Sequence, residues 1–384
     1  MSRAHRAVLL AMIILVGGSV APAIRTSASA LSPVKVASLP GYEMVIYAAH
    51  TDHPIPEVAL PEVFLQKANG VGAETATFAV SYHGFSPEAQ TAFQFAVDIW
   101  ASLITSPVPI VVDATWTPLS PGVLGSAGPR NFFADFSNAP VANTWYPAAM
   151  ANKLAGADLD PADYDIRARF NSDFTAWYFG TDGQTPFSQY DFVSVVLHEL
   201  GHGLGFTGSM AVGGTNCSPG MGCWGSGTSY PFIYDRFAVN GSSQLLISSF
   251  ANDSPELAAQ LTSNNVFFSG ANAVKANGNT NVKLYAPGAW SQGSSYAHLD
   301  NVFDGTPNAL MTFSIANGES IHNPGSVTLC MFKDMGWTVT VSGAAAASTS
   351  AMSAPGFVVF SPDNVTVMVT ETLYLPLVMN GDDC

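Results

Sequence analysis

The chain has 384 residues, of which 48% are hydrophobic and only 11% are charged, and its formal net charge is -15 at pH 7. This length suits one large domain, or a domain with an insertion and a tail. The acidic balance opposes binding to nucleic acid and to anionic membrane surfaces, so neither is an expected partner.

Residues 1–30 predict a secretory signal peptide. Arg3 and Arg6 give a basic start, Ala7 to Val16 is an apolar run, and residues 28–30 (Ala-Ser-Ala) offer a small-residue cleavage site. A membrane anchor is the alternative, but the run is shorter than the ~20 residues that a spanning helix needs. Cleavage would remove three arginines and no acid, taking the formal charge from -15 to -18. We expect a secreted or surface-associated protein without stable membrane insertion after signal removal.

Residues 31–72 contain many prolines and no clear periodicity. They are either a lead-in segment of the domain or a short pro-region. Residues 75–83 have the character of a strand. A helix then follows, because Ser86 is a good N-cap, Pro87 suits the first helical position, and apolar residues recur at helical spacing up to Leu103.

The next two predicted elements are strands. Residues 108–116 are rich in β-branched side chains, and residues 165–170 alternate as a half-buried edge strand would. A helix over residues 193–204 comes next. This order implies an α+β fold in which a twisted mixed sheet is backed by two helices.

That last helix carries the most informative stretch of the chain, His-Glu-Leu-Gly-His at residues 198–202. Residues four apart lie on one helix face, so His198 and His202 can bind one metal ion with Glu199 beside it. A structural zinc site needs no extra carboxylate, whereas hydrolysis needs a base. We therefore predict a catalytic zinc site with Glu199 as general base.

Glycines in and after this helix also call for an explanation. Gly201 and Gly203 each cost about 1 kcal/mol of helix stability relative to Ala. We expect close approach of another backbone, or of a substrate, at these positions. Gly205 is predicted to end the helix and to turn the chain sharply.

About ninety residues rich in Gly, Ser and Asn follow, and residues 209–294 are predicted to be an insertion with a small fold of its own. It should contain a strand near 234–239 and a short helix over 255–261. Cys217 and Cys223 are the expected disulfide in an exported chain. The other two cysteines, Cys330 and Cys384, could pair or stay free.

The C-terminal part begins with a predicted helix over residues 327–335 that ends near Gly336. Residues 343–384 are predicted to be a small-residue linker, up to residue 355, and a tail. Within the tail, 365–369 and 373–378 have strand character but are too short for an independent domain.

Catalytic zinc normally has three protein ligands, so one more is needed. Here the chain resembles the metzincin metallopeptidases, which extend the helix motif to HExxHxxGxxH and have a methionine turn. The chain matches through Gly205 but has Gly208 where the third His would stand, and so is more similar to leishmanolysin-like enzymes, in which this His follows a long insertion. The resemblance implies His298 as third ligand, Met311 as hydrophobic floor, and a metallopeptidase domain over residues 73–342.

The sequence departs from that pattern at two places. Leu299-Asp300 replaces a Trp-Glu pair, and Phe313 stands where some metzincins have a Tyr. Asp235 and Glu256 remain alternative third ligands. The other histidines, which lack partner spacing, are expected to be surface or hydrogen-bonded residues; they are His50, His53, His83 and His322.

The resemblance implies a secreted zinc endopeptidase that acts on protein or peptide substrates. An edge strand near residues 167–171 would pair with the extended substrate backbone. Two alternatives stay open. One is a non-catalytic, zinc-stabilised surface protein that serves adhesion or carbohydrate binding. The other is a zinc hydrolase of non-peptide amide bonds. A calcium site is neither indicated nor excluded.

Overall fold

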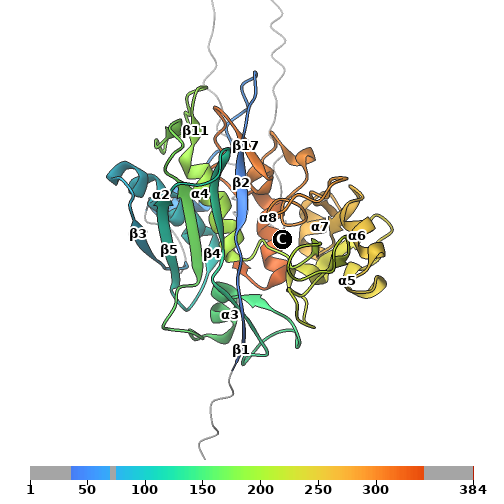
Figure 1. The fold of residues 1–384 in the computed structure, drawn as a ribbon. Coiled ribbons are helices and arrows are strands. Elements are labelled where there is room, and N and C mark those ends of the chain that lie inside the picture. The colour runs from blue at the N-terminus through green and yellow to red at the C-terminus, as the bar shows by residue number, and fades with distance from the viewer. Residues whose placement is uncertain (1–35, 70–74, 341–383) are drawn as a thin grey trace, which may run out of the picture. The chain divides into compact units, whose positions relative to one another are not determined.

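A six-stranded mixed sheet organises residues 36–69, 75–340 and 384, which the computed structural model describes (Figure 1). The predicted signal peptide, the linker and the strand-like tail segments lie outside these residues. The described residues from Val36 onward form one compact unit. The structure thus confirms a mixed α+β fold with a twisted mixed sheet, and residues 36–69 contribute to it.

The order of strands in this sheet decides which of them have a free edge. The order is β17 (Ser314–Ala316), β2 (Met44–Ala49), β6 (Val123–Pro129), β9 (Ile166–Asn171), β5 (Ile110–Thr117), β3 (Phe78–His83). Strands β3, β5 and β9 are parallel, β6 is antiparallel to both β9 and β2, and β17 is parallel to β2.

The prediction of an edge strand at residues 165–170 is wrong, because β9 lies between β5 and β6. The strand that pairs with it on this side is β6, which has the sequence Val-Leu-Gly-Ser-Ala-Gly-Pro and is buried along its whole length. Such a run of small residues shows no period of two. The pattern of β9 alone therefore could not reveal that a neighbour lies on this side.

Two long helices cover one face of the sheet. α2 (Pro87–Leu103) begins at Ser86, whose Oγ accepts a hydrogen bond from the Ala89 amide at 3.2 Å, as predicted. α4 (Phe192–Leu204) packs between α2 and strands β6 and β9. The indole of Trp100 on α2 donates to the Leu197 carbonyl of α4 at 2.9 Å. This contact fixes the helix that carries the His-Glu-Leu-Gly-His stretch.

The predicted insertion has its own strands and helices, at the side of the molecule where Figure 1 labels α5 to α7. They are β12 (Ala211–Val212), β13 (Gly222–Cys223), β14 (Ala238–Asn240), α5 (Leu246–Ser249), α6 (Pro255–Leu261), β15 (Val266–Phe268), α7 (Ala271–Ala276) and β16 (Val282–Lys283). The helix at 255–261 is confirmed. The strand near 234–239 is wrong in its first part, since Tyr234–Phe237 is a 3-10 turn and the strand begins at Ala238.

The insertion shares the main core. α7 packs on α8 (Gly325–Met335), where the Asp334 carboxylate accepts hydrogen bonds from the Asn272 and Ala273 amides at 3.0 and 2.9 Å. α8 ends at Gly336, as predicted. The remaining elements are β1 (Ala37–Pro40), α1 (Glu62–Ala68), β4 (Ile104–Thr105), β7 (Asn131–Ala134), β8 (Tyr146–Pro147), α3 (Ala148–Ala155), β10 (Trp177–Tyr178), β11 (Tyr190–Asp191), η2 (Asn301–Phe303), η3 (Ala309–Met311) and β18 (Thr338–Val339).

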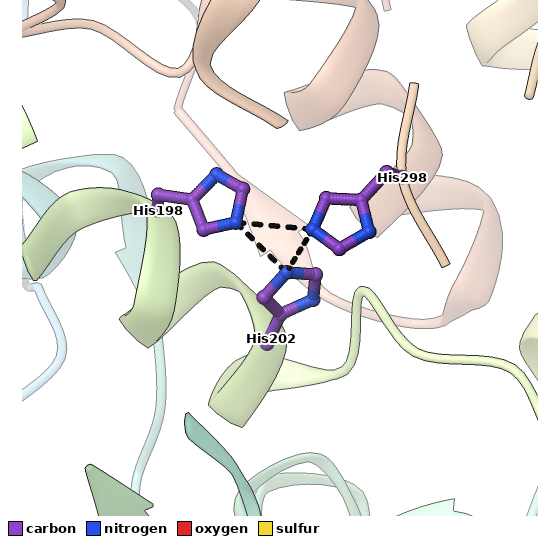
Figure 2. Close-up of side chains that lie close together, drawn as sticks. All are labelled: His198, His202 and His298. Atoms are coloured by element: carbon purple, nitrogen blue, oxygen red, sulfur yellow. Dashed lines mark hydrogen bonds between the residues drawn. The ribbon is translucent and has the colours of Figure 1, made fainter. Parts of the chain in front are cut away.

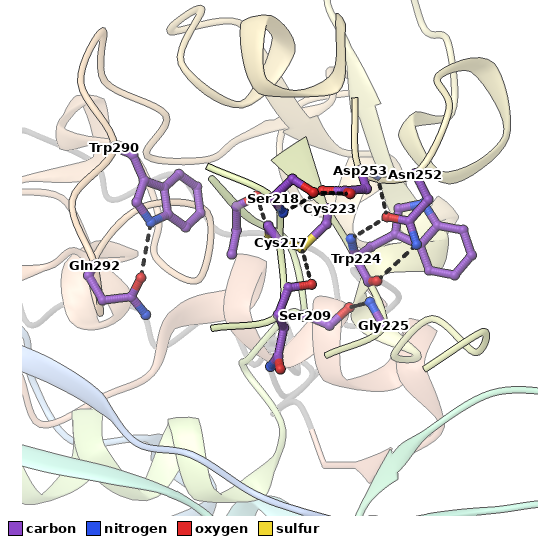
Figure 3. Close-up of a disulfide and its surroundings, with 12 residues drawn as sticks. Ser209, Cys217, Ser218, Cys223, Trp224, Gly225, Asn252, Asp253, Trp290 and Gln292 are labelled. Atoms are coloured by element: carbon purple, nitrogen blue, oxygen red, sulfur yellow. Dashed lines mark hydrogen bonds between the residues drawn. A yellow bond between two sulfur atoms is a disulfide. The ribbon is translucent and has the colours of Figure 1, made fainter. Parts of the chain in front are cut away.

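All four cysteines are paired. The expected Cys217–Cys223 disulfide is present, and Cys330 of α8 pairs with Cys384. Figure 3 shows how the first disulfide loop is tied to Asp253, which accepts hydrogen bonds from the amide and the hydroxyl of Ser218. Two disulfides fit an extracellular protein. Among the described helices, none has both the length and the apolar character needed to cross a membrane.

Candidate metal centre

Three histidines from two distant parts of the chain converge inside the protein (Figure 2). The Nε2 atoms of His198 and His202 are 3.0 Å apart, those of His202 and His298 are 3.0 Å apart, and those of His198 and His298 are 3.3 Å apart. All three side chains are buried. The two residues of α4 are thus joined by His298, which the chain reaches only after the insertion.

Each imidazole is held by a backbone carbonyl at its other nitrogen. The Nδ1 of His198 lies 2.6 Å from the Leu310 carbonyl, that of His202 lies 2.7 Å from the Phe206 carbonyl, and that of His298 lies 2.8 Å from Ser294. A carbonyl only accepts, so each Nδ1 carries the proton. All three Nε2 atoms then present lone pairs to one point, which is the arrangement of histidines that ligate a metal.

The donor set fits a divalent cation. Ligands at tetrahedral corners about 2.05 Å from zinc lie about 3.3 Å from one another, close to the separations observed here. Burial lowers the pKa of the His198 imidazole to about 4. Burial and the neighbouring rings lower the pKa of His202 and His298 well below the usual value. The rings are therefore neutral, and three facing lone pairs repel one another unless a cation lies between them.

Glu199 follows His198 on the same helix and is completely buried. Its Oε1 accepts a hydrogen bond from the Ile46 amide of β2 at 3.1 Å. Its Oε2 has no hydrogen-bond partner within the described part of the chain. Burial raises the pKa of this carboxyl well above its usual value. An unpartnered carboxylate oxygen on the residue that follows His198 leaves one acceptor open for a further polar group, such as water.

The glycines of α4 are explained by side chains of other elements. A Cβ at Gly201 would lie 2.7 Å from the Met311 sulfur, and one at Gly203 would lie 2.3 Å from Ile166 Cγ2. The expectation of a nearby backbone or substrate at these glycines is therefore wrong. Gly205 ends the helix with a φ of 123°, as predicted. Gly125 of β6 has a comparable role, since its Cβ would approach the Glu199 carboxylate to 3.1 Å.

Met311 lies directly against α4, which we call the metal helix because it carries His198 and His202. It belongs to η3, is fully buried, and places its sulfur against Gly201. The residue before it, Leu310, supplies the carbonyl that holds His198. Backbone contacts join the same turn to the third histidine, because the Leu299 amide donates to the Met311 carbonyl at 2.8 Å. The turn thus connects the helix histidines to His298.

The alternative third ligands lie elsewhere. Glu256 is exposed in the first turn of α6. The Asp235 carboxylate accepts hydrogen bonds from the Ser209 and Phe232 amides at 2.9 and 2.8 Å and from the Tyr296 hydroxyl at 2.9 Å. Neither belongs to the histidine cluster of the described residues. Asp235 instead ties the chain after the metal helix to the segment that carries His298.

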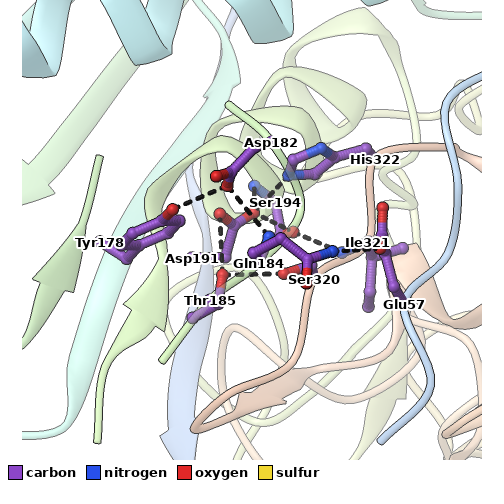
Figure 4. A network of polar contacts seen from close by, with 10 residues as sticks. All are labelled: Glu57, Tyr178, Asp182, Gln184, Thr185, Asp191, Ser194, Ser320, Ile321 and His322. Carbon is purple, nitrogen blue, oxygen red and sulfur yellow. Dashed lines mark hydrogen bonds and ion pairs between the residues drawn. The ribbon is translucent and has the colours of Figure 1, made fainter. Parts of the chain in front are cut away.

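His322 does not behave as a surface residue. It is buried, and its Nε2 lies 2.8 Å from the carboxylate of Asp191, the N-cap of α4 (Figure 4). The same carboxylate accepts from the Ser194 amide and hydroxyl. His50 and His83 are exposed and each contacts an aspartate, and His53 is exposed. Sequence reasoning missed the role of His322 in fixing the start of the metal helix, because Asp191 is 131 residues away.

The part of the site that sequence reasoning missed altogether is β2. This strand passes over Glu199, and its Ile46 amide donates to the Glu199 carboxylate. Both histidines of α4 are fully buried as well. Residues 31–72 offered no periodicity from which a central strand could be predicted.

One protein family shows similarity to part of the chain. A family model described as SPBPB7E8-like matches residues 85–213. The matched stretch includes α2, β6, β9 and the metal helix, and ends before His298. No curated protein matches the chain.

Proposed function

We propose that this protein is a secreted zinc-dependent endopeptidase of metzincin type. The observation that carries the proposal is the convergence of His198, His202 and His298 next to a buried carboxylate with one unpartnered oxygen. A site that served only to hold a metal would need the three imidazoles but not Glu199. Two further features support the metzincin assignment, namely the backing helix α2 and the methionine turn at Met311.

His198, His202 and His298 would hold the zinc ion. When bound there, zinc supplies a Lewis acid that polarises a carbonyl and lowers the pKa of water. The burial that raises the pKa of Glu199 makes this carboxylate basic enough to take a proton from the attacking water. Glu199 would then pass this proton to the nitrogen of the departing amine. Water thus adds across the peptide bond, and no proton is gained or lost in the cycle.

The test is Glu199→Gln, assayed on quenched peptides with and without a chelator. The variant keeps the shape of the side chain and leaves the three histidines intact, so it should bind one zinc ion per chain. Activity should fall by about 100-fold to 10,000-fold, as expected for the loss of a general base. Glu256→Gln, a change at an exposed acid of α6, is the matched control.

Chelator-sensitive cleavage by Glu199→Gln at the wild-type rate would refute the role of this residue. The proposal as a whole would fail if the zinc-loaded protein cleaved no peptide even after the buried histidines had been made accessible to substrate.

A further inference from the structure

β2 contacts the proposed general base, Glu199, through a main-chain amide. It comes from the N-terminal segment and lies between β6 and β17, which is more than 260 residues further along the chain (Figure 1). Its Ile46 amide donates to the Glu199 carboxylate at 3.1 Å. A main-chain amide of the protein itself is thus hydrogen-bonded to the carboxylate with which a main-chain nitrogen of the substrate would interact.

The hydrogen bonds of β2 run to both sides, as those of an inserted peptide would. On one side β2 is antiparallel to β6, with Met44 opposite Ala127 and Ile46 opposite Gly125. On the other side it is parallel to β17, and the Tyr47 amide donates to the Phe313 carbonyl at 3.1 Å. Without β2, a slot one strand wide would lie between β6, whose main-chain groups would be free opposite residues 44–47, and β17, whose groups would be free opposite residues 47–49. Such slots bind extended peptides.

The ladder between β2 and β6 is interrupted at the catalytic carboxylate. The register shifts between Ile46 and Tyr47, at the residue whose amide turns to Glu199. Glu199 is proposed to give its proton to the nitrogen of the departing amine. The nitrogen of Ile46, which contacts Glu199, corresponds to this amine nitrogen. The Val45–Ile46 peptide bond therefore corresponds to the bond that would be cleaved in a substrate.

This register places Glu43 three positions before the bond, in contact with two arginines of β9. Its Oε2 lies 2.5 Å from Arg169 Nη2 and 2.7 Å from Arg169 Nε, and its Oε1 lies 3.5 Å from Arg167 Nη1. The Ser126 hydroxyl also donates to it at 2.7 Å. The arginines are about two-fifths exposed, whereas the Glu43 side chain is only 12% exposed. The two guanidinium groups form a receptor for one carboxylate.

Space for a peptide continues beside this end of β2. The residues that line a pocket of about 440 Å³ include Tyr42, Glu43 and Met44, and also Trp290, Gln292 and Ala297. Ala297 precedes His298. The pocket therefore reaches the residue next to the third histidine.

We infer that β2 is a built-in occupant of the peptide-binding slot between β6 and β17, and that Arg167 and Arg169 select substrates with an acidic side chain three positions before the cleaved bond. This inference rests on the proposed peptidase function and specifies its substrate. The intact protein holds the slot closed, and turnover requires β2 to leave it.

The first experiment uses the intact, folded protein. Glu43→Gln removes the charge that holds β2, so hydrogen exchange of the amides in residues 43–49 should become at least 10-fold faster. Glu57→Gln changes an exposed acid of the same N-terminal segment that contacts Gln184 rather than the arginines, and should leave that exchange unchanged. Equal exchange in Glu43→Gln, Glu57→Gln and wild type would overturn the inference.

A second experiment keeps the inference testable if Glu43→Gln fails to fold. A recognition sequence for a site-specific protease is inserted after Asp52, in the exposed turn that follows β2. The folded protein is then cut, and the N-terminal fragment is separated from it. The remaining protein should bind a synthetic peptide of residues 41–49. Replacing Glu by Gln in that peptide, or Arg169 by Gln in the protein, should weaken binding at least 10-fold.

Two results of the second experiment would overturn the inference. One is a fragment that cannot be removed without loss of the fold, which would make β2 a core strand. The other is equal binding of the Glu and Gln peptides. Because exchange and binding need no turnover, they separate this inference from the proposed function. A cut protein that binds the peptide and zinc but cleaves nothing would refute only the peptidase proposal.

Discussion

His298 shows how one residue completes a chemical site at the scale of the side chain. Its ring is held by the Ser294 carbonyl at Nδ1, and its Nε2 lies 3.0 Å from that of His202. Without it, His198 and His202 would offer two ligands to a metal that prefers at least three from the protein. Asp235 positions the same segment through the Tyr296 hydroxyl but contributes no ligand.

We expect His298→Ala to weaken zinc binding by more than about 100-fold, because even the loss of a hydrogen-bond partner of a ligand costs 10- to 100-fold. Zinc content after dialysis against a weak chelator measures this. His83→Ala removes an exposed histidine and should retain one zinc ion per chain. A His298→Ala protein that also retains one zinc ion would assign the third ligand to another group.

At the scale of the element, β17 is supported by a buried acid. Glu319 is 5% exposed, and its Oε2 accepts a hydrogen bond from the Ala316 amide at 2.9 Å. Burial raises the pKa of this carboxyl from 4.5 to about 7. The folded state therefore binds the proton more tightly than the unfolded state. Stability from this group is fully present below pH 4.5 and is lost as the pH rises towards 7.

Glu319→Gln should remove this pH dependence, because the amide oxygen can still accept the hydrogen bond but cannot ionise. We compare the free energies of unfolding of wild type and variant at each pH. The difference, wild type minus variant, should fall by up to about 3 kcal/mol as the pH rises from 4.5 to 8. Urea unfolding at several pH values measures it, with exposed Glu256→Gln as control. The same pH slope in wild type and Glu319→Gln would show that Glu319 titrates as it does in the unfolded chain.

At the scale of the whole molecule, the two disulfides close loops of very different length. Cys217 and Cys223 are six residues apart, whereas Cys330 and Cys384 are 54 apart. The second disulfide joins residue 384 to α8, which also anchors α7 of the insertion through Asp334. Closing the longer loop removes more entropy from the unfolded chain.

Replacing both cysteines of the long loop by alanine should therefore destabilise the protein by about 4 kcal/mol, against about 2 kcal/mol for the pair Cys217 and Cys223. Denaturant unfolding of the two double variants gives the comparison. A larger loss for the short loop would mean that contacts within that loop, such as the Ser218–Asp253 hydrogen bonds, outweigh chain entropy.

Local patterns determined much of this protein by sequence alone. The N-cap Ser86, the helix spacing that brings His198 and His202 to one face, the position of Glu199 and the helix end at Gly205 all depend on neighbours within a few residues. Periodicity and capping act at that range, and so the sequence revealed them. His298 came only from a family resemblance, since no local rule relates residues about a hundred positions apart.

Only the tertiary structure decided which distant segments are neighbours. It placed β9 inside the sheet, buried His322 against Asp191, paired Cys330 with Cys384 and inserted β2 between β6 and β17. In each case the partner is more than fifty residues away or lies in a run of small or irregular residues. Strand pairing depends on the backbone groups that every residue carries, so the side-chain pattern of one strand cannot identify its partner.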